Sequence, residues 1–118
     1  MIFEIDNYKS LKNTLESLCE FLRLEKISQE VIFNSKLVAC ELLGNVLKHS
    51  DGKATLKGEL KEGRLELAIL SQFPFFPTEV ELPDLFSEHG RGLYLAKNLS
   101  ESIERLSNGI LIRIKIEE

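Results

Sequence analysis

The fold is decided by residues 54–70, ATLKGELKEGRLELAIL. Polar and apolar residues alternate on both sides of the pair Glu62-Gly63. The apolar or small positions are Ala54, Leu56, Gly58 and Leu60 before this pair, and Leu65, Leu67 and Ile69 after it. Alternation with a period of two is typical of a strand with one buried face, and a glycine-containing pair between two such runs is typical of a tight reversal. The stretch therefore predicts a β-hairpin.

The C-terminal end of the chain repeats this pattern. Behind Asn108-Gly109, a pair typical of type I′ turns, isoleucines alternate with other residues up to Ile116. We expect the partner strand at about Ser102–Leu106. A second hairpin is therefore predicted.

Two helices are expected before the first hairpin, together with a short edge strand at residues 2–5. Leucines repeat at helical spacing over residues 11–22, and either Asp6 or Asn7 can cap the first helix. The second helix is expected to begin after Ser28 and to end at residues 49–52. It spans roughly five to six turns.

Between the hairpins lies SQFPFFPTEVELPDLFSEHGRG, residues 71–92, which holds all three prolines and four of the seven phenylalanines. It predicts a loop with apolar anchors, and helix is expected to resume over residues 93–101. Helices and antiparallel hairpins without regular βαβ alternation favour an α+β fold. We expect a two-layer α/β sandwich with helices on one face of a mostly antiparallel sheet. With 118 residues, 43% of them hydrophobic, the chain fits a single domain over residues 1–118.

Composition limits the classes of function. The chain has 15 Lys and Arg against 19 Asp and Glu, a net charge of −4, and no dense basic cluster, which argues against direct binding of nucleic acid. Glu4 and Asp6 lie where a signal peptide would be apolar, and no apolar run approaches a membrane span. Cys19 and Cys40 lack metal-ligand spacing, so we expect reduced thiols in or near the core. A cytoplasmic protein without membrane association is predicted.

The best candidate for a polar site on a helix is ELLGNVLKHS, residues 41–50. Because a helix turns by about 100° per residue, Glu41 and Asn45 lie within about 40° of each other, and Lys48 extends the row. A carboxylate and an amide at the border of an apolar stripe need partners, such as a metal ion, a phosphate-bound water or another side chain. The alternative is a solvated edge in which Glu41 pairs with Lys36 or Lys48.

A second candidate is EHGRGLYLAKNL, residues 88–99, where Gly90 and Gly92 bracket Arg91 just before a helix. Glycines let the backbone approach a ligand closely, and the free N–H groups of a first helical turn offer an anion site. A flexible joint is the alternative.

Together, E-x-x-x-N-x-x-K-H and G-x-G-L, about forty residues apart, resemble the GHKL ATPases of gyrase, heat-shock chaperone, histidine kinase and mismatch-repair type. The resemblance is specifically to the short anti-sigma-factor serine kinases, and it spans roughly residues 8–116. It implies an ATP-binding sandwich of the Bergerat type. Glu41 would match the general base and Asn45 the magnesium ligand, with Lys48 near the phosphates, as suits phosphoryl transfer.

In the same resemblance, the glycine box would pass under the phosphates at the helix start; its residues are Gly90, Arg91, Gly92 and Leu93. The cofactors implied are ATP and Mg²⁺.

The family has a further box, similar to D-x-G-x-G, at the end of the strand that here begins LELAIL. Alignment by that strand places Ser71 where an aspartate accepts from the adenine amino group, and Phe73 where a glycine allows close approach. Loss of a charged acceptor weakens a complex by about 1.5–3 kcal/mol, or roughly 10- to 150-fold. Ser71 retains a neutral hydrogen bond, directly or through water. Phe73 either fills the adenine end or anchors the loop.

Three functions remain open, of which we favour the first. The chain is a bacterial regulatory protein that resembles an anti-sigma factor and binds a protein partner, with ATP binding impaired or lost. Alternatively, it is an active ATP-dependent serine/threonine kinase that phosphorylates an anti-sigma-factor antagonist, or an unrelated α+β protein. The resemblance implies a sigma factor or an anti-sigma antagonist as partner, and a homodimer whose interface exposed apolar residues on the first helix or initial strand would supply.

Overall fold

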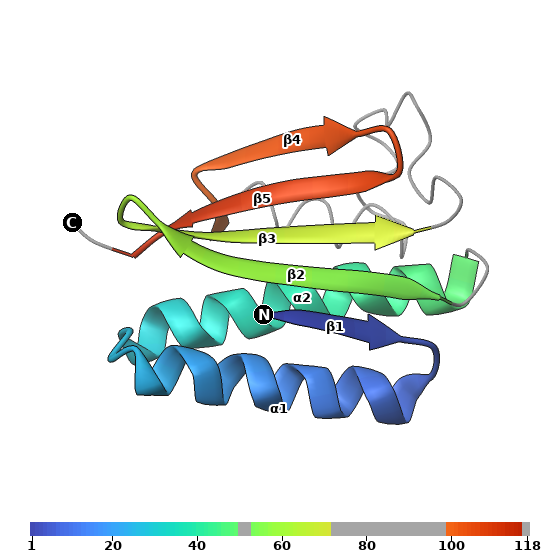
Figure 1. Cartoon of the computed structure of the whole chain (residues 1–118), viewed down its shortest axis with the longest axis horizontal. Helices are drawn as coiled ribbons and strands as arrows, with labels where there is room; N and C mark the ends of the chain where they lie inside the picture. The colour runs from blue at the N-terminus through green and yellow to red at the C-terminus, as the bar shows by residue number, and fades with distance from the viewer. Residues whose placement is uncertain (50–52, 72–98, 117–118) are drawn as a thin grey trace.

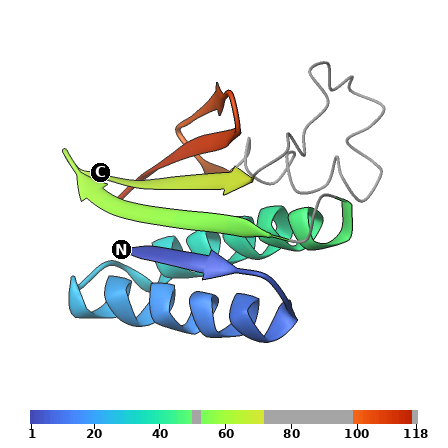
Figure 2. The same cartoon turned by 45° about the vertical axis from the view of Figure 1, so that its right-hand side comes forward.

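The computed structural model describes residues 1–49, 53–71 and 99–116, apart from the side chains of Lys48 and His49. Two helices, α1 (Tyr8–Leu24) and α2 (Gln29–His49), lie on one face of a five-stranded sheet (Figure 1). Every strand pairing is antiparallel, in the spatial order β1-β2-β3-β5-β4. The strands are β1 (Ile2–Ile5), β2 (Ala54–Lys61), β3 (Arg64–Ser71), β4 (Ser102–Leu106) and β5 (Gly109–Lys115). The turned view in Figure 2 separates the helix layer from the sheet layer, which confirms the predicted two-layer α+β sandwich.

Helix α1 begins with the capping interaction that the sequence predicts. The side chain of Asn7 accepts a hydrogen bond from the Ser10 N–H at 2.8 Å, and Ser10 Oγ accepts from the Asn7 N–H at 3.1 Å. This reciprocal pair satisfies two N–H groups that the first turn leaves without helical partners. Of the two expected caps, Asn7 is therefore the one used.

Helix α2 begins after Ser28, as predicted. Ser28 Oγ accepts from the Val31 N–H at 3.3 Å, and its carbonyl oxygen accepts from the Ile32 N–H at 3.0 Å. Within the helix, the buried hydroxyl of Ser35 donates to the Val31 carbonyl oxygen at 2.7 Å, so its burial leaves no unsatisfied donor. The apolar stripe faces the sheet, with Val38 and Leu42 fully buried.

The first hairpin has the expected turn. Glu62 and Gly63 have φ values of 52° and 75°, and two successive positive φ values are the signature of a type I′ turn. The turn sets the register of β2 against β3, in which Lys61 pairs with Arg64 and Ala54 with Ser71. The alternating residues all reach the inner face; those of β3 and β5 are Leu65, Leu67, Ile69, Ile110, Ile112 and Ile114, each at most 3% exposed.

The prediction of a type I′ turn at Asn108-Gly109 is wrong. The turn residues are Ser107 and Asn108, while Gly109 is the first residue of β5 and pairs with Leu106. Neither Asn108 nor Gly109 has a positive φ, so this is not a type I′ turn. The glycine is needed for strand packing instead, because a Cβ at this position would overlap the Ile69 carbonyl oxygen and lie 2.9 Å from the Leu70 Cα.

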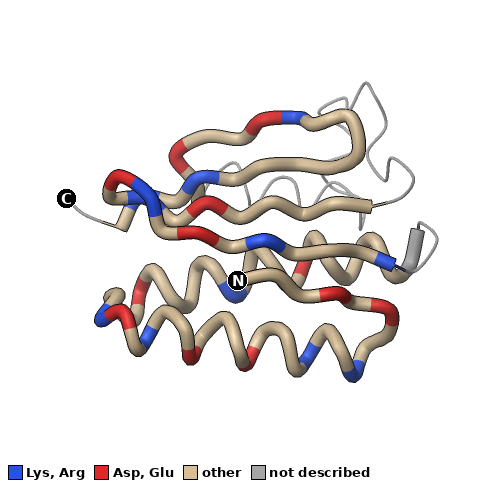
Figure 3. Tube along the Cα trace, viewed as in Figure 1, with Lys and Arg blue, Asp and Glu red and all other residues tan. Residues whose placement is uncertain are grey.

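The open face of the sheet carries ion pairs. Arg113 of β5 contacts Glu66 on β3 at 3.2 Å and Glu104 on β4 at 3.6 Å. Arg64 pairs with Glu101, and the hydrogen bond between them raises the pKa of the arginine and lowers that of the carboxyl group. Figure 3 shows both signs of charge spread over the helices and strands that the structure describes.

Two expectations about the helices need correction or lie beyond the structure. Cys19 is buried, but Cys40 is exposed because it lies on the outward side of α2, so the prediction of two thiols in or near the core fails for Cys40. Both thiols are free. The predicted phenylalanine-rich loop and the part of the predicted helix before Leu99 lie outside the described residues. Leu99 is helical and Ser100 is not, so the prediction of helix up to residue 101 is wrong.

Among the described helices, none is both long and apolar enough to cross a membrane.

Substitution of Gly109 by Ala should destabilise the protein by about 3 kcal/mol or more, because the new methyl group meets backbone atoms that cannot move aside. Gly44→Ala is the matched control: a Cβ there has no neighbour within 4 Å, and alanine should stabilise the helix by about 0.5–1 kcal/mol. Urea unfolding measures the change in the free energy of unfolding for both variants, provided that the slope of this free energy against urea concentration stays unchanged. Equal effects of the two substitutions would contradict this account of Gly109.

Asn7→Ala should lower the free energy of unfolding by about 1 kcal/mol through loss of the cap. The same substitution at Asn13, an exposed position inside α1, should leave stability unchanged or slightly raised because alanine is the better helix former. Thermal unfolding of the two variants beside the parent protein provides the comparison. A loss of stability in Asn13→Ala equal to that in Asn7→Ala would rule out capping as the cause.

Candidate functional site

Helix α2 places Glu41 and Asn45 one turn apart at the margin of the core. Asn45 is only 7% exposed and follows the fully buried Leu42 by three positions, whereas Glu41 is half-buried. The predicted polar row therefore borders the apolar stripe. A solvated edge does not describe Asn45, since its amide is removed from bulk water. In the described part of the chain, every buried side-chain nitrogen and oxygen has a hydrogen-bond partner, so this burial is compensated.

Strand β3 places Ser71 at its C-terminal end, on the face toward the helices. Ser71 is 3% exposed and continues the inner row that includes Ile69. Its N–H donates to the carbonyl oxygen of Asn108 at 2.7 Å, which ties the end of β3 to the turn between β4 and β5. Ser71 is the last residue of β3 and the last residue that the structure describes before the gap at residues 72–98.

The two halves of the predicted site lie toward one end of the molecule. β3 and α2 run in the same direction and terminate on the same side (Figures 1 and 2). Asn45 is near the C-terminal end of α2, and Ser71 is the last residue of β3. Other predicted site positions lie outside the described residues: the side chain of Lys48, and Gly90, Arg91, Gly92 and Leu93.

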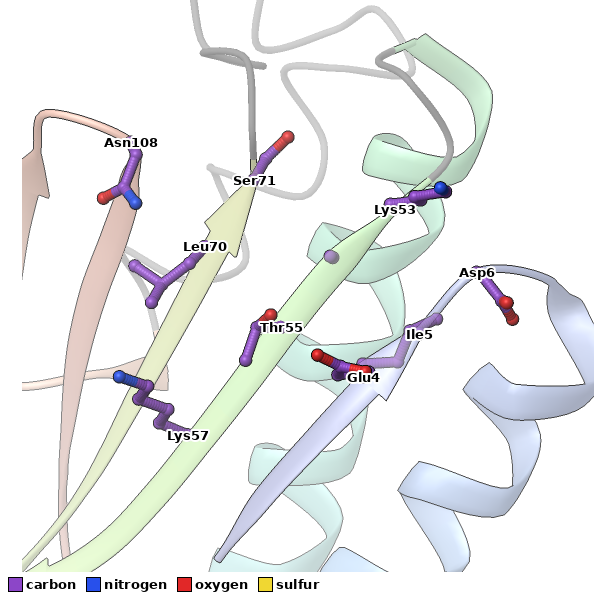
Figure 4. Close-up of a pocket in the computed structure, with 10 residues that line it drawn as sticks. Glu4, Ile5, Asp6, Lys53, Thr55, Lys57, Leu70, Ser71 and Asn108 are labelled. Carbon is purple, nitrogen blue, oxygen red and sulfur yellow. The ribbon is translucent and has the colours of Figure 1, made fainter.

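A cavity of about 560 Å³ opens beside Ser71 (Figure 4). Glu4 in β1 and Asp6 just after it contribute carboxylates. Lys53 just before β2 and Lys57 in β2 contribute ammonium groups. Glu41 and Asn45 do not line this cavity. Because both signs of charge border it, its lining favours no single class of charged ligand.

Sequence reasoning missed two neighbours of Ser71. Lys53 and Asn108 line the same cavity. Lys53 directly precedes the alternating run, so its position near the strand end follows from the hairpin. The place of Asn108 depends on the register between β3 and β5, which pairs Leu70 with Gly109. No local sequence signal gives that register.

The pKa of Cys40, the residue directly before Glu41, depends on the charges near it on helix α2. Although Cys40 is exposed, desolvation by the surrounding protein raises the pKa of its thiol, the negative charge of Glu41 raises it further, and Lys36 opposes both effects. The thiol is therefore more fully protonated at neutral pH than an ordinary cysteine. It is a probe of charge on the same helix as the proposed site.

The resemblance implies a Mg²⁺ ion that a nucleotide would bring, to which α2 would contribute the amide oxygen of Asn45. In the described residues, no group of three or more His, Cys, Asp or Glu side chains could hold a metal ion. Mg²⁺ on a nucleotide takes most of its ligands from phosphate and water, so one amide oxygen from Asn45 suffices for the protein's share. Glu41 would remain available to orient an acceptor.

No protein-family model matches this chain, and no curated protein matches it at a significant level.

Replacing Glu41 by Gln should lower the pKa of Cys40 and speed its alkylation by iodoacetamide at neutral pH, because only the thiolate reacts. Lys36→Gln should slow the reaction for the opposite reason. The rate difference between these variants should vanish well above the thiol pKa, where all forms are thiolates. Mass spectrometry after timed quenching measures the rates.

Cys40→Ala gives the background rate, which should be low because Cys19 is 6% exposed. Slower alkylation in Glu41→Gln than in the parent protein would show that the Glu41 carboxylate does not act on this thiol.

Proposed function

We propose that this chain is a bacterial regulatory protein with the GHKL-type ATPase fold, similar to the anti-sigma-factor serine kinases, and that it acts by binding a protein partner. ATP binding is weak or lost. The observation that carries this proposal is Ser71, a neutral residue that is 3% exposed at the end of β3, where the resemblance requires a carboxylate.

The arrangement of elements supports the family part of the proposal. Two helices on one face of an antiparallel sheet are followed by a hairpin, an intervening segment and a second hairpin. Asn45 is buried on the side of α2 toward the core, and Glu41 lies one turn before it. These positions suit a magnesium ligand and a general base that both act close to the sheet layer.

The energetics of Ser71 support the loss of ATP affinity. Replacing a charged acceptor by a neutral hydroxyl weakens binding by about 1.5–3 kcal/mol. A complex with a Kd of about 10 µM would then have a Kd of roughly 0.1–1.5 mM. A regulator with such a site works through its protein contacts, because nucleotide occupancy no longer controls it sharply.

The partner we propose is a sigma factor or an anti-sigma antagonist in the cytoplasm. Large apolar side chains are exposed on both the initial strand and the helices, and each offers contact area to a partner or to a second copy in a homodimer. They are Ile2, Tyr8, Leu24 and Phe33, each 59–71% exposed.

The active serine/threonine kinase is the second candidate, favoured by the retained pair on α2. In that case Glu41 would accept the proton of the partner's serine hydroxyl as the hydroxyl oxygen bonds to the γ-phosphoryl group of ATP and ADP leaves. Asn45 would hold the Mg²⁺ that ATP brings. Nucleotide affinity separates this candidate from the first.

Calorimetric titration of ATP and ADP, with and without Mg²⁺, should show no binding tighter than about 0.1 mM for the parent protein. Ser71→Asp should bind ATP at least about 10-fold more tightly, because the carboxylate restores the charged acceptor. Adding Asn45→Ala to Ser71→Asp should remove the dependence on Mg²⁺. Ser102→Asp on β4 is the matched control, since it adds the same charge away from β3 and should gain no affinity.

Two results would overturn parts of the proposal. Micromolar, magnesium-dependent binding by the parent protein that Asn45→Ala abolishes would establish an intact nucleotide site and favour the kinase. No gain from Ser71→Asp would contradict the proposal that the neutral residue at position 71 is what weakens ATP binding. Thermal unfolding guards against a misfolded variant: without nucleotide, the buried carboxylate should lower the Tm of Ser71→Asp, and ATP should restore it.

A further inference from the structure

We draw no further inference here: the strongest candidate, the outward face of helix α2 around the exposed Phe33 and the open space over Gly44, is an apolar face without a partner in the described residues, and nothing in the structure shows what covers it.

Discussion

Burial of the inner face of β3 beneath helix α2 is the constraint on which the rest of the structure depends. The inner side chains Leu65, Leu67 and Ile69 have no exposed surface, and full burial of such a side chain contributes about 1.5–3 kcal/mol. A register shift of one residue would exchange them for their neighbours, including Arg64 and Glu66. Only the observed register keeps the apolar side chains of β3 on the buried face and the charged ones on the open face. It also sets the position of Ser71, the last residue of β3.

The opposite face of the sheet contributes specificity more than stability. Arg113 bridges β3 and β4 through Glu66 and Glu104, but these side chains are 21–56% exposed, and ion pairs of this kind contribute about 0–1 kcal/mol. Their effect is on pairing. The pairing of Glu66 with Arg113, which carry opposite charges on adjacent strands, favours the observed register of β3 and β5. The same register of β5 against β3 brings Asn108 beside Ser71.

The sequence predicts local features well and contacts between distant segments poorly. The alternation of residues 54–70, the cap at Asn7 and the turn at Glu62-Gly63 each depend on neighbours in the chain, and all three predictions are confirmed. The role of Gly109 depends on how closely β5 approaches β3, which no local pattern contains, so its turn propensity was misleading. The same division applies to the site: helical geometry predicts the margin position of Asn45, whereas the contact of Ser71 with Asn108 requires the full sheet.

The two halves of the proposed site belong to different layers, Ser71 to the sheet and Asn45 to helix α2, and the two positions differ in what a charge would cost. A carboxylate at position 71 would be buried on the inner face, where an unpaired charge costs several kcal/mol; a bound ligand that pairs with it would offset that cost. In the absence of such a ligand, a neutral hydroxyl is the more stable residue there. Asn45 carries no charge, and the described structure leaves no buried side-chain polar atom unsatisfied, so it costs little to retain. Under the proposed function, a neutral residue at position 71 together with Asn45 is therefore compatible with a stable fold.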